Sequence, residues 1–213
     1  MNELFEISKA SLQVSGISLI IAGGIGIPAG VIIGLSAFRG RKWLITLVNT
    51  GMGLPPVLVG LVVALLLWRS GPLGFMGLLY SKTAMIIAQT IIALPLVIAF
   101  TIAGIQKIEP ELIRQTVSLG ATRFQFFRII TQEARLTILV ALMAGFGSII
   151  SEVGAVMMVG GNIKGDTAVL TTGILQSTRM GSYNEALMMG GVLLAISFTV
   201  NLILTLIQQK KLN

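Results

Sequence analysis

The chain has 213 residues, of which 54% are hydrophobic and 11% charged, and its net charge is +7. A soluble domain carries about 25% charged residues, so this composition excludes an ordinary water-soluble globular protein. The chain has no Cys and no His, which excludes disulfides, thiolate nucleophiles and zinc sites, and its single Asp leaves intramembrane hydrolase chemistry almost without reactive groups.

Five apolar segments are long enough to cross a bilayer, which takes about 20 residues. They predict an all-α membrane protein with transmembrane helices over residues 12–38, 45–68, 83–105, 136–159 and 186–207. The first segment is too long for a signal peptide and follows an acidic stretch, so we expect it to be a span. No linker separates the segments, so residues 1–213 are expected to form a single transmembrane domain.

Lys and Arg are spread unevenly among the loops, and cytoplasmic loops carry the excess of these residues. With the N-terminus outside, ten of the fifteen lie inside: Arg39, Arg41, Lys42, Lys107, Arg114, Arg123, Arg128, Arg135, Lys210 and Lys211. The sequence therefore predicts an N-out, C-in topology. The net positive charge reflects that topology, and we expect no nucleic-acid partner.

The first span contains Gly26, Gly30 and Gly34 at four-residue spacing, with Pro28 among them. Small residues at this spacing let helix backbones approach closely. The stripe indicates tight packing within one subunit or a contact between two copies. Pro28 predicts a kink or local break that neighbouring helices must satisfy.

The second span opens with Asn49-Thr-Gly-Met-Gly-Leu-Pro-Pro, which ends in Pro55 and Pro56. Two prolines remove two backbone donors and clash with the preceding turn. An unwound stretch at membrane depth requires cover by protein or water, which makes this region a candidate pathway lining. A simple helix start near Pro55 is the alternative.

The third span holds Gln89, and a turn signal, Gly71-Pro-Leu-Gly74, precedes it. A lone amide within a span makes an interhelical hydrogen bond more often than it binds a substrate. Both roles stay open at this point.

The fourth span includes Ser151, Glu152 and Gly154 within an apolar run. A carboxylate inside a membrane costs about 2.5–3.5 kcal/mol on insertion scales, so Glu152 is a functional candidate by default. It is either a structural carboxylate bonded to backbone or to a partner helix, or a gate element, or a substrate ligand. After it, Asn162 and Thr167 lie in a glycine-rich stretch that indicates an ordered external loop, and residues 169–175 are apolar enough to dip back toward the bilayer. An ordinary connecting loop is the alternative.

Residues 109–130 form a charged amphipathic island between the third and fourth spans. Pro110 is expected to start a helix, Gly120 to end it and Thr122 to cap a second one. One shared apolar side is expected from Leu112, Leu119, Phe124, Phe127 and Ile130, with Arg114, Arg123 and Arg128 solvated. Such a helix lies along a membrane surface, and its turn can project into a soluble partner or contact lipid alone.

Several motifs then occur in a fixed order: Leu54-Pro-Pro-Val-Leu-Val-Gly60, Gly71-Pro-Leu-Gly74, Leu119-Gly-Ala121, Ser151-Glu-Val-Gly-Ala155 and Gly161-Asn-Ile-Lys-Gly165. Together they resemble the permease subunit of molybdate/sulfate/tungstate-type ABC importers. The run from Ser151 to Ile163 is most similar to that of the tungstate permeases.

This resemblance implies a homodimeric permease in a bacterial or archaeal plasma membrane. It also implies two separate ABC ATPase subunits, which bind ATP and Mg, and an extracytoplasmic oxyanion-binding protein. The chain itself is expected to hold no cofactor and to hydrolyse nothing. The ATPase-coupling residues implied are Ser118, Leu119, Gly120, Ala121, Thr122, Arg123 and Phe124. The expected pathway or gate residues are Pro55, Pro56, Ser151, Glu152, Gly154 and Asn162.

The island departs from the family motif in one respect. The family's Glu-Ala-Ala positions are Arg114-Gln115-Thr116 here, and its Leu-Pro positions are Gln132-Glu133. The acidic contact made by the family is therefore absent. The partner ATPase either has a compensating acidic surface or binds the apolar and turn residues.

Tungstate is a tetrahedral dianion that Glu152 would not hold directly. The leading function is thus an oxyanion permease, most similar to those for tungstate, with a pathway lined by neutral donors. The alternatives are a permease for molybdate or sulfate, and a membrane scaffold protein without a transport role.

Overall fold

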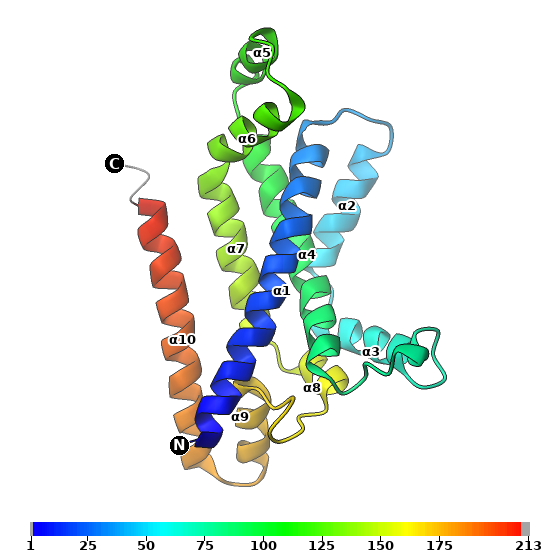
Figure 1. Ribbon diagram of the computed structural model, residues 1–213, viewed down its shortest axis with the longest axis vertical. Helices are drawn as coiled ribbons and strands as arrows, with labels where there is room; N and C mark the ends of the chain where they lie inside the picture. The colour runs from blue at the N-terminus through cyan, green and yellow to red at the C-terminus, as the bar shows by residue number, and fades with distance from the viewer. Residues whose placement is uncertain (1, 210–213) are drawn as a thin grey trace.

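The computed structural model describes residues 2–209, and within that range it is all α-helical, as the sequence predicts. Three helices are each long and apolar enough to cross a bilayer: α1 (Asn2–Leu35), α4 (Lys82–Ile105) and α10 (Tyr183–Gln209). They confirm the first, third and fifth predicted spans (Figure 1). Pro28 lies inside α1 without ending it, so of the kink or local break expected there, the local break is wrong.

Two further candidate spans are bent helix pairs. Helices α2 (Arg41–Met52) and α3 (Pro56–Leu67) meet at 99°, and α6 (Arg123–Glu133) and α7 (Arg135–Ile150) meet at 71°. The unwound stretch predicted at the proline pair is therefore present. The chain unwinds over residues 53–55, and a new helix starts at Pro56, where proline's missing N–H needs no partner.

A continuous helix over the fourth predicted span is also wrong. Helix α7 ends at Ile150, and the short helix α8 (Gly154–Gly160) follows after a break at residues 151–153. Sequence periodicity does not reveal this break because hydrogen bonds from other segments stabilise it.

Helix α4 lies at the centre of the subunit, and the glycine stripe of α1 packs along it. A Cβ added to Gly30 would lie 2.6 Å from the Thr101 Cβ, and one added to Gly34 would lie 2.8 Å from the Ile105 side chain. These distances are shorter than real Cβ contacts, so the two backbones meet because the residues are glycines. Of the two interpretations of the stripe, packing within one subunit is the one confirmed.

The elements gather at two opposite ends of the bundle. Helices α5 (Pro110–Ser118) and α6 lie at one end, and α8, α9 (Leu170–Arg179) and the N-terminus lie at the other, with α3 reaching sideways from the bundle (Figure 1). The turn predicted at Gly71-Pro-Leu-Gly74 is present and leads into the short helix η1 (Gly74–Met76). Lys210 and Lys211, which entered the topology prediction, lie outside the described residues.

Candidate functional site

The α5–α6 tip, residues 117–124, is a tight turn between two short helices. Gly120 has φ +74°, a backbone conformation that glycine adopts without strain. Thr122 caps α6: its hydroxyl accepts the Gln125 N–H at 3.3 Å, and the Gln125 side chain accepts the Thr122 N–H at 2.9 Å. The predicted helix start at Pro110, the break at Gly120 and the cap at Thr122 are all confirmed.

The apolar residues of the island face two directions rather than one. Ile130 is fully buried, and Leu112, Ile113, Phe126 and Phe127 pack against its cluster at the ends of α1 and α4. By contrast, Leu119 and Phe124 are 87% and 76% exposed. The single shared apolar side is therefore wrong, because the turn at Gly120 redirects Leu119 and Phe124 away from the face that anchors the island.

The exposed part of the island combines apolar and basic side chains. Val117, which sequence reasoning missed, is 62% exposed beside Leu119 and Phe124. The sequence could have indicated Val117 only as an apolar residue on an otherwise polar helix face. Ser118, Arg123, Arg114 and Arg128 are exposed, and Ala121 is half-buried. Exposed apolar residues, with exposed arginines on the same two short helices, suit a groove with apolar walls and acidic edges.

The second predicted set surrounds the α2–α3 break. Pro55 and Pro56 line a cavity of about 200 Å³. Its wall also includes Gly51 and Gly53 of the same break, together with Ile92 of α4 and Ser148 of α7. The proline pair thus borders a void between three segments, at the place where the sequence predicts a pathway lining.

Helix α3 packs closely against α8, with a glycine on each helix at the contact. A Cβ on Gly60 would lie 2.5 Å from the Ala155 Cα, and a Cβ on Gly154 would lie 2.5 Å from Val57 Cγ2. The structure therefore brings the segment after Pro56 against the segment after Glu152. We call this α3–α8 contact, with the break at residues 151–153, the gate region, after the role expected of its residues from the sequence.

Glu152 is held by the backbone around the break. Its Oε1 accepts the Ala155 N–H at 2.9 Å, at the start of α8, and its carbonyl accepts the Thr171 hydroxyl of α9 at 2.9 Å. Of the three roles left open, these bonds favour the structural carboxylate. Ser151 is exposed, and its hydroxyl donates to its own helix, to the Gly147 carbonyl at 2.8 Å.

Asn162 lies apart from the gate region, in the loop between α8 and α9. It adopts φ 51°, its amide nitrogen donates to the Gln176 side chain, and its Oδ1 accepts the Thr172 hydroxyl at 2.6 Å. Asn162 therefore orders the loop, and the structure does not bring it to the proline pair.

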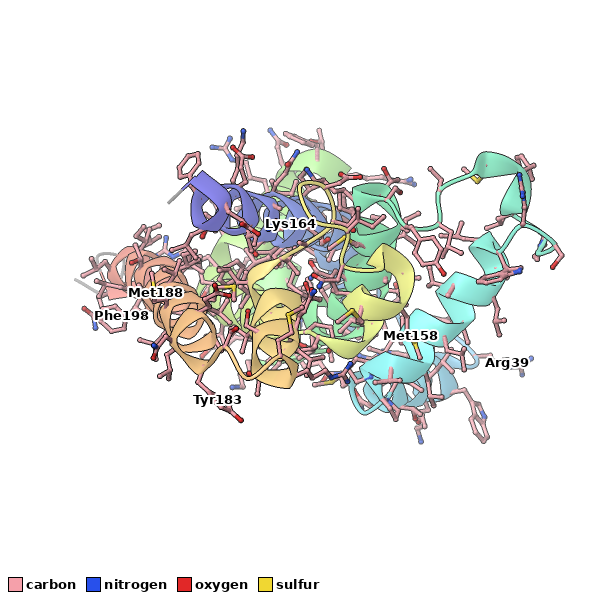
Figure 2. All side chains as sticks on the ribbon, turned by 90° about the horizontal axis from the view of Figure 1, so that it is seen from below. Arg39, Met158, Lys164, Tyr183, Met188 and Phe198 are labelled. Atoms are coloured by element: carbon pink, nitrogen blue, oxygen red, sulfur yellow. The ribbon has the colours of Figure 1, made fainter. Side chains whose placement is uncertain are left out.

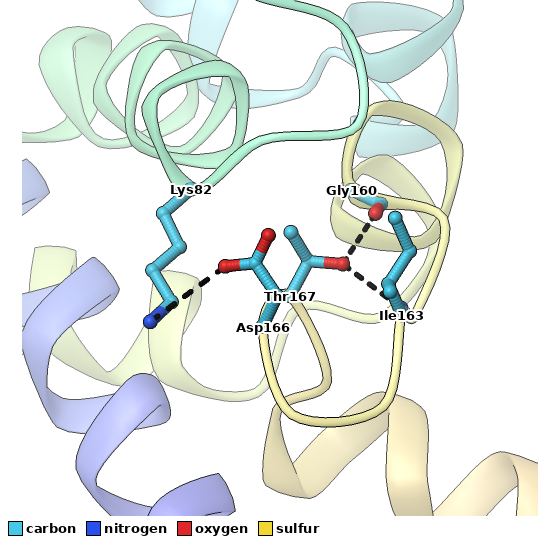
Figure 3. A network of polar contacts seen from close by, with 5 residues as sticks. All are labelled: Lys82, Gly160, Ile163, Asp166 and Thr167. Atoms are coloured by element: carbon cyan, nitrogen blue, oxygen red, sulfur yellow. Dashed lines mark hydrogen bonds and ion pairs between the residues drawn. The ribbon is translucent and has the colours of Figure 1, made fainter.

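The same loop is fixed by Thr167, which is fully buried. Its Oγ1 donates to the Gly160 carbonyl at 2.5 Å and accepts the Ile163 N–H at 2.9 Å, and the neighbouring Asp166 lies 3.9 Å from Lys82 Nζ (Figure 3). The prediction of an ordered loop is confirmed. The apolar stretch after it begins α9, whose first turns are buried, and is not an ordinary connecting loop.

A cavity of about 470 Å³ lies between this loop, the start of α1, α9 and α10. Figure 2, seen from this end, shows Lys164 beside α1 and Met188 on α10. Lys164 Nζ lies 2.7 Å from Glu3 Oε1, and this hydrogen bond and charge raise the pKa of Lys164 above its usual value. Among residues 2–209, no cluster of His, Cys, Asp or Glu could hold a metal ion.

Residues 26–212 match the model of the family described as binding-protein-dependent transport system inner membrane component. The chain is 41% identical to the tungstate uptake system permease protein TupB of Peptoclostridium acidaminophilum, over 98% of this chain and 91% of that protein. It is 38% identical to a probable anion ABC transporter permease protein of Haloferax volcanii, over 93% and 88% of the two chains.

Solved structures also resemble the fold. A chain from a bacterial ABC transporter involved in the import of the acidic polysaccharide alginate superposes with a TM-score of 0.80 at 23% identity, covering 99% of this chain and 80% of that one. At this identity the similarity establishes the fold, and the sequence relatives carry the functional argument.

Proposed function

The chain belongs to the family of binding-protein-dependent transport system inner membrane components, and we propose that it is the permease subunit through which an ATP-driven importer carries tungstate into the cell. The observation that carries the substrate is the 41% identity with a tungstate uptake permease over 98% of this chain. Molybdate and sulfate permeases are more distant, at 28% and 29% identity.

In this proposal the permease is a homodimer with its α5–α6 tip in the cytoplasm. Two ABC ATPase subunits bind the tips, and ATP and Mg are bound by those subunits. The exposure of Leu119 and Phe124 supports docking of the ATPase through apolar contacts. Such contacts would replace the acidic contact that the family makes at positions 114–116 and that this chain lacks. A binding protein delivers the oxyanion at the opposite end, beside α8 and α9.

The gate region supplies the pathway roles. Pro55 and Pro56 border the cavity, Ser151 and Glu152 lie in the break, and Gly154 begins α8 against α3. Glu152 keeps a structural role, because its carboxylate already accepts a backbone N–H and its charge would repel a dianion. The anion instead passes neutral hydroxyl and backbone donors, and high-affinity selection belongs to the binding protein.

Element-resolved uptake tests the substrate. Cells with and without the chain receive tungstate, molybdate and sulfate together at low concentration, and mass spectrometry measures the three elements inside. We expect selective loss of tungsten uptake without the chain. Loss of molybdenum or sulfur instead would keep the importer and correct the anion.

The scaffold alternative needs a separate test. An affinity-tagged chain should co-purify with an ABC ATPase, and replacement of Leu119-Gly120-Ala121 should abolish this association. Unchanged uptake of all three elements, together with no bound ATPase, would favour the scaffold role.

A further inference from the structure

Gln89 is a buried amide in the middle of α4. Its side chain is 3% exposed, and its Nε2 donates to the Ile149 carbonyl at 3.0 Å, across 60 residues of chain. The interhelical hydrogen bond expected for a lone Gln is therefore confirmed. Its acceptor lies on the last turn of α7, directly before the break in the gate region.

The Ile149 carbonyl is one of the backbone groups that a helix leaves without an internal partner at its C-terminus. In a membrane such a group must be satisfied by protein, because lipid offers no donor. Here the carbonyl accepts both Gln89 and the Glu152 N–H, the latter at 3.2 Å. The bond from Gln89 thus makes it favourable for α7 to end at this point.

The break is held from a second side by α9. The Thr171 hydroxyl donates to the Glu152 carbonyl at 2.9 Å, while the Glu152 carboxylate caps α8. Gln89 and Thr171 are thus two tethers, from α4 and α9, on a three-residue break. The break in turn sets where α8 meets α3.

The amide of Gln89 is only half satisfied. Its Oε1 is buried and has no hydrogen-bond partner within residues 2–209. Exchanging the positions of Oε1 and Nε2 would not give Oε1 a donor. Oε1 would then face the Ile149 carbonyl, which accepts hydrogen bonds and cannot donate one. An unpaired buried acceptor disfavours this arrangement relative to any other in which Oε1 finds a donor.

We propose that Gln89 is a positioning residue of the transport cycle, which holds the α7–α8 break in the present arrangement through a bond that the cycle releases. The donor makes the bond specific, and the unpaired acceptor lowers the cost of breaking it. The inference rests on the proposed function only in that a transport cycle requires the gate region to move.

A single thiol at Ser151 reports the state of the break. The chain has no Cys, so Ser151→Cys is unique, and the exposed Ser151 side chain bonds only within its own helix. The rate of alkylation by N-ethylmaleimide is measured in membrane vesicles from cells that express the full transporter. This readout needs no transported anion, so a wrong substrate assignment does not affect it.

Gln89→Leu removes the donor at similar volume and is expected to raise the alkylation rate about fivefold, the ratio that corresponds to one buried hydrogen bond. Thr171→Val removes the second tether and is expected to change the rate in the same direction. The matched control is Ser18→Ala, because Ser18 Oγ also donates to a carbonyl of α4, that of Ile86 at 3.2 Å, but does not touch the break.

The coupling ratio gives a second readout. A transporter with Gln89→Leu should consume more ATP in its ATPase subunits for each anion transported, whereas one with Ser18→Ala should keep the parent ratio. Parent-like alkylation and coupling in Gln89→Leu would overturn the proposal. If that variant fails to reach the membrane, parent-like alkylation in Thr171→Val would overturn it instead.

Discussion

Gly60 on α3 lies against the backbone of Ala155 on α8 so closely that a Cβ at position 60 would come 2.5 Å from the Ala155 Cα. No side chain can relieve this contact, because the group in the way is main chain. The distance between α3 and α8 therefore depends on a hydrogen atom at residue 60.

Gly60→Ala is expected to push α3 away from α8 and abolish uptake while the chain still inserts in the membrane. Overpacking of this kind costs about 1–3 kcal/mol, which thermal unfolding in detergent detects. Gly24→Ala is the matched control, since a Cβ at Gly24 meets nothing within 4 Å. Equal uptake by the two variants would contradict the role of the α3–α8 contact.

Glu152→Gln is expected to retain most uptake, because the amide oxygen can still accept the Ala155 N–H. Glu152→Ala loses that acceptor, so α8 loses its cap at a cost of about 1 kcal/mol, and uptake falls further. Initial rates of uptake at equal membrane levels compare the two variants. If Glu152→Gln lost as much uptake as Glu152→Ala, the charge of Glu152 would be needed, and its role would be that of a gate element.

Gly120→Leu is expected to abolish ATPase binding and uptake with normal membrane insertion. The substitution strains a backbone at φ +74° by about 1–2 kcal/mol and distorts the turn that presents Leu119 and Phe124.

Gly40→Leu provides the control for this variant. Gly40 has φ +92° and open space around it, so the backbone strain is similar, but it lies outside the α5–α6 tip. Co-purification of the ATPase measures docking, and we expect Gly40→Leu to retain it. Loss of docking in both variants would mean that strain rather than the tip is responsible.

The ion pair of Lys164 with Glu3 predicts that the order of the start of α1 depends on pH in the alkaline range. Because the pKa of Lys164 is raised above its ordinary value of 10.5, the pair is intact at neutral pH and is lost as the pH rises through the higher value. A spin label at Phe5→Cys, an exposed position near Glu3, should therefore gain mobility only above pH 10.5.

Two variants check the origin of that change. Lys164→Arg should keep the label ordered at high pH, because guanidinium stays charged. Lys164→Met should leave it mobile at every pH. A label that responds to pH in Lys164→Met would show that another group controls the start of α1.

The island at residues 109–130 was largely predictable because its signals are local. Pro110, Gly120 and Thr122 act on the backbone within one or two turns, so their effects follow from their order in the chain. The exposure of Leu119 and Phe124 was not predictable, since it depends on how the turn orients α5 against α6.

The break after α7 could not be predicted from the sequence, because the groups that stabilise it are not local. Residues 136–159 are apolar throughout most of their length, and Glu152 is the one charged residue among them. The groups that end the helix, Gln89 and Thr171, lie far away in sequence. The glycine stripe of α1 was visible, but its partner on α4 could be known only from the packed structure.

The bend between α6 and α7 links the α5–α6 tip to the gate region through two consecutive helices. Only Ala134 separates α6 from α7, and α7 then runs uninterrupted to Ile150. A 16-residue helix is about 24 Å long and nearly incompressible along its axis. Helix α7 is thus a rod, and a displacement of the bend at Ala134 along its axis arrives at the break as an axial displacement rather than as a gradual loosening of the bundle.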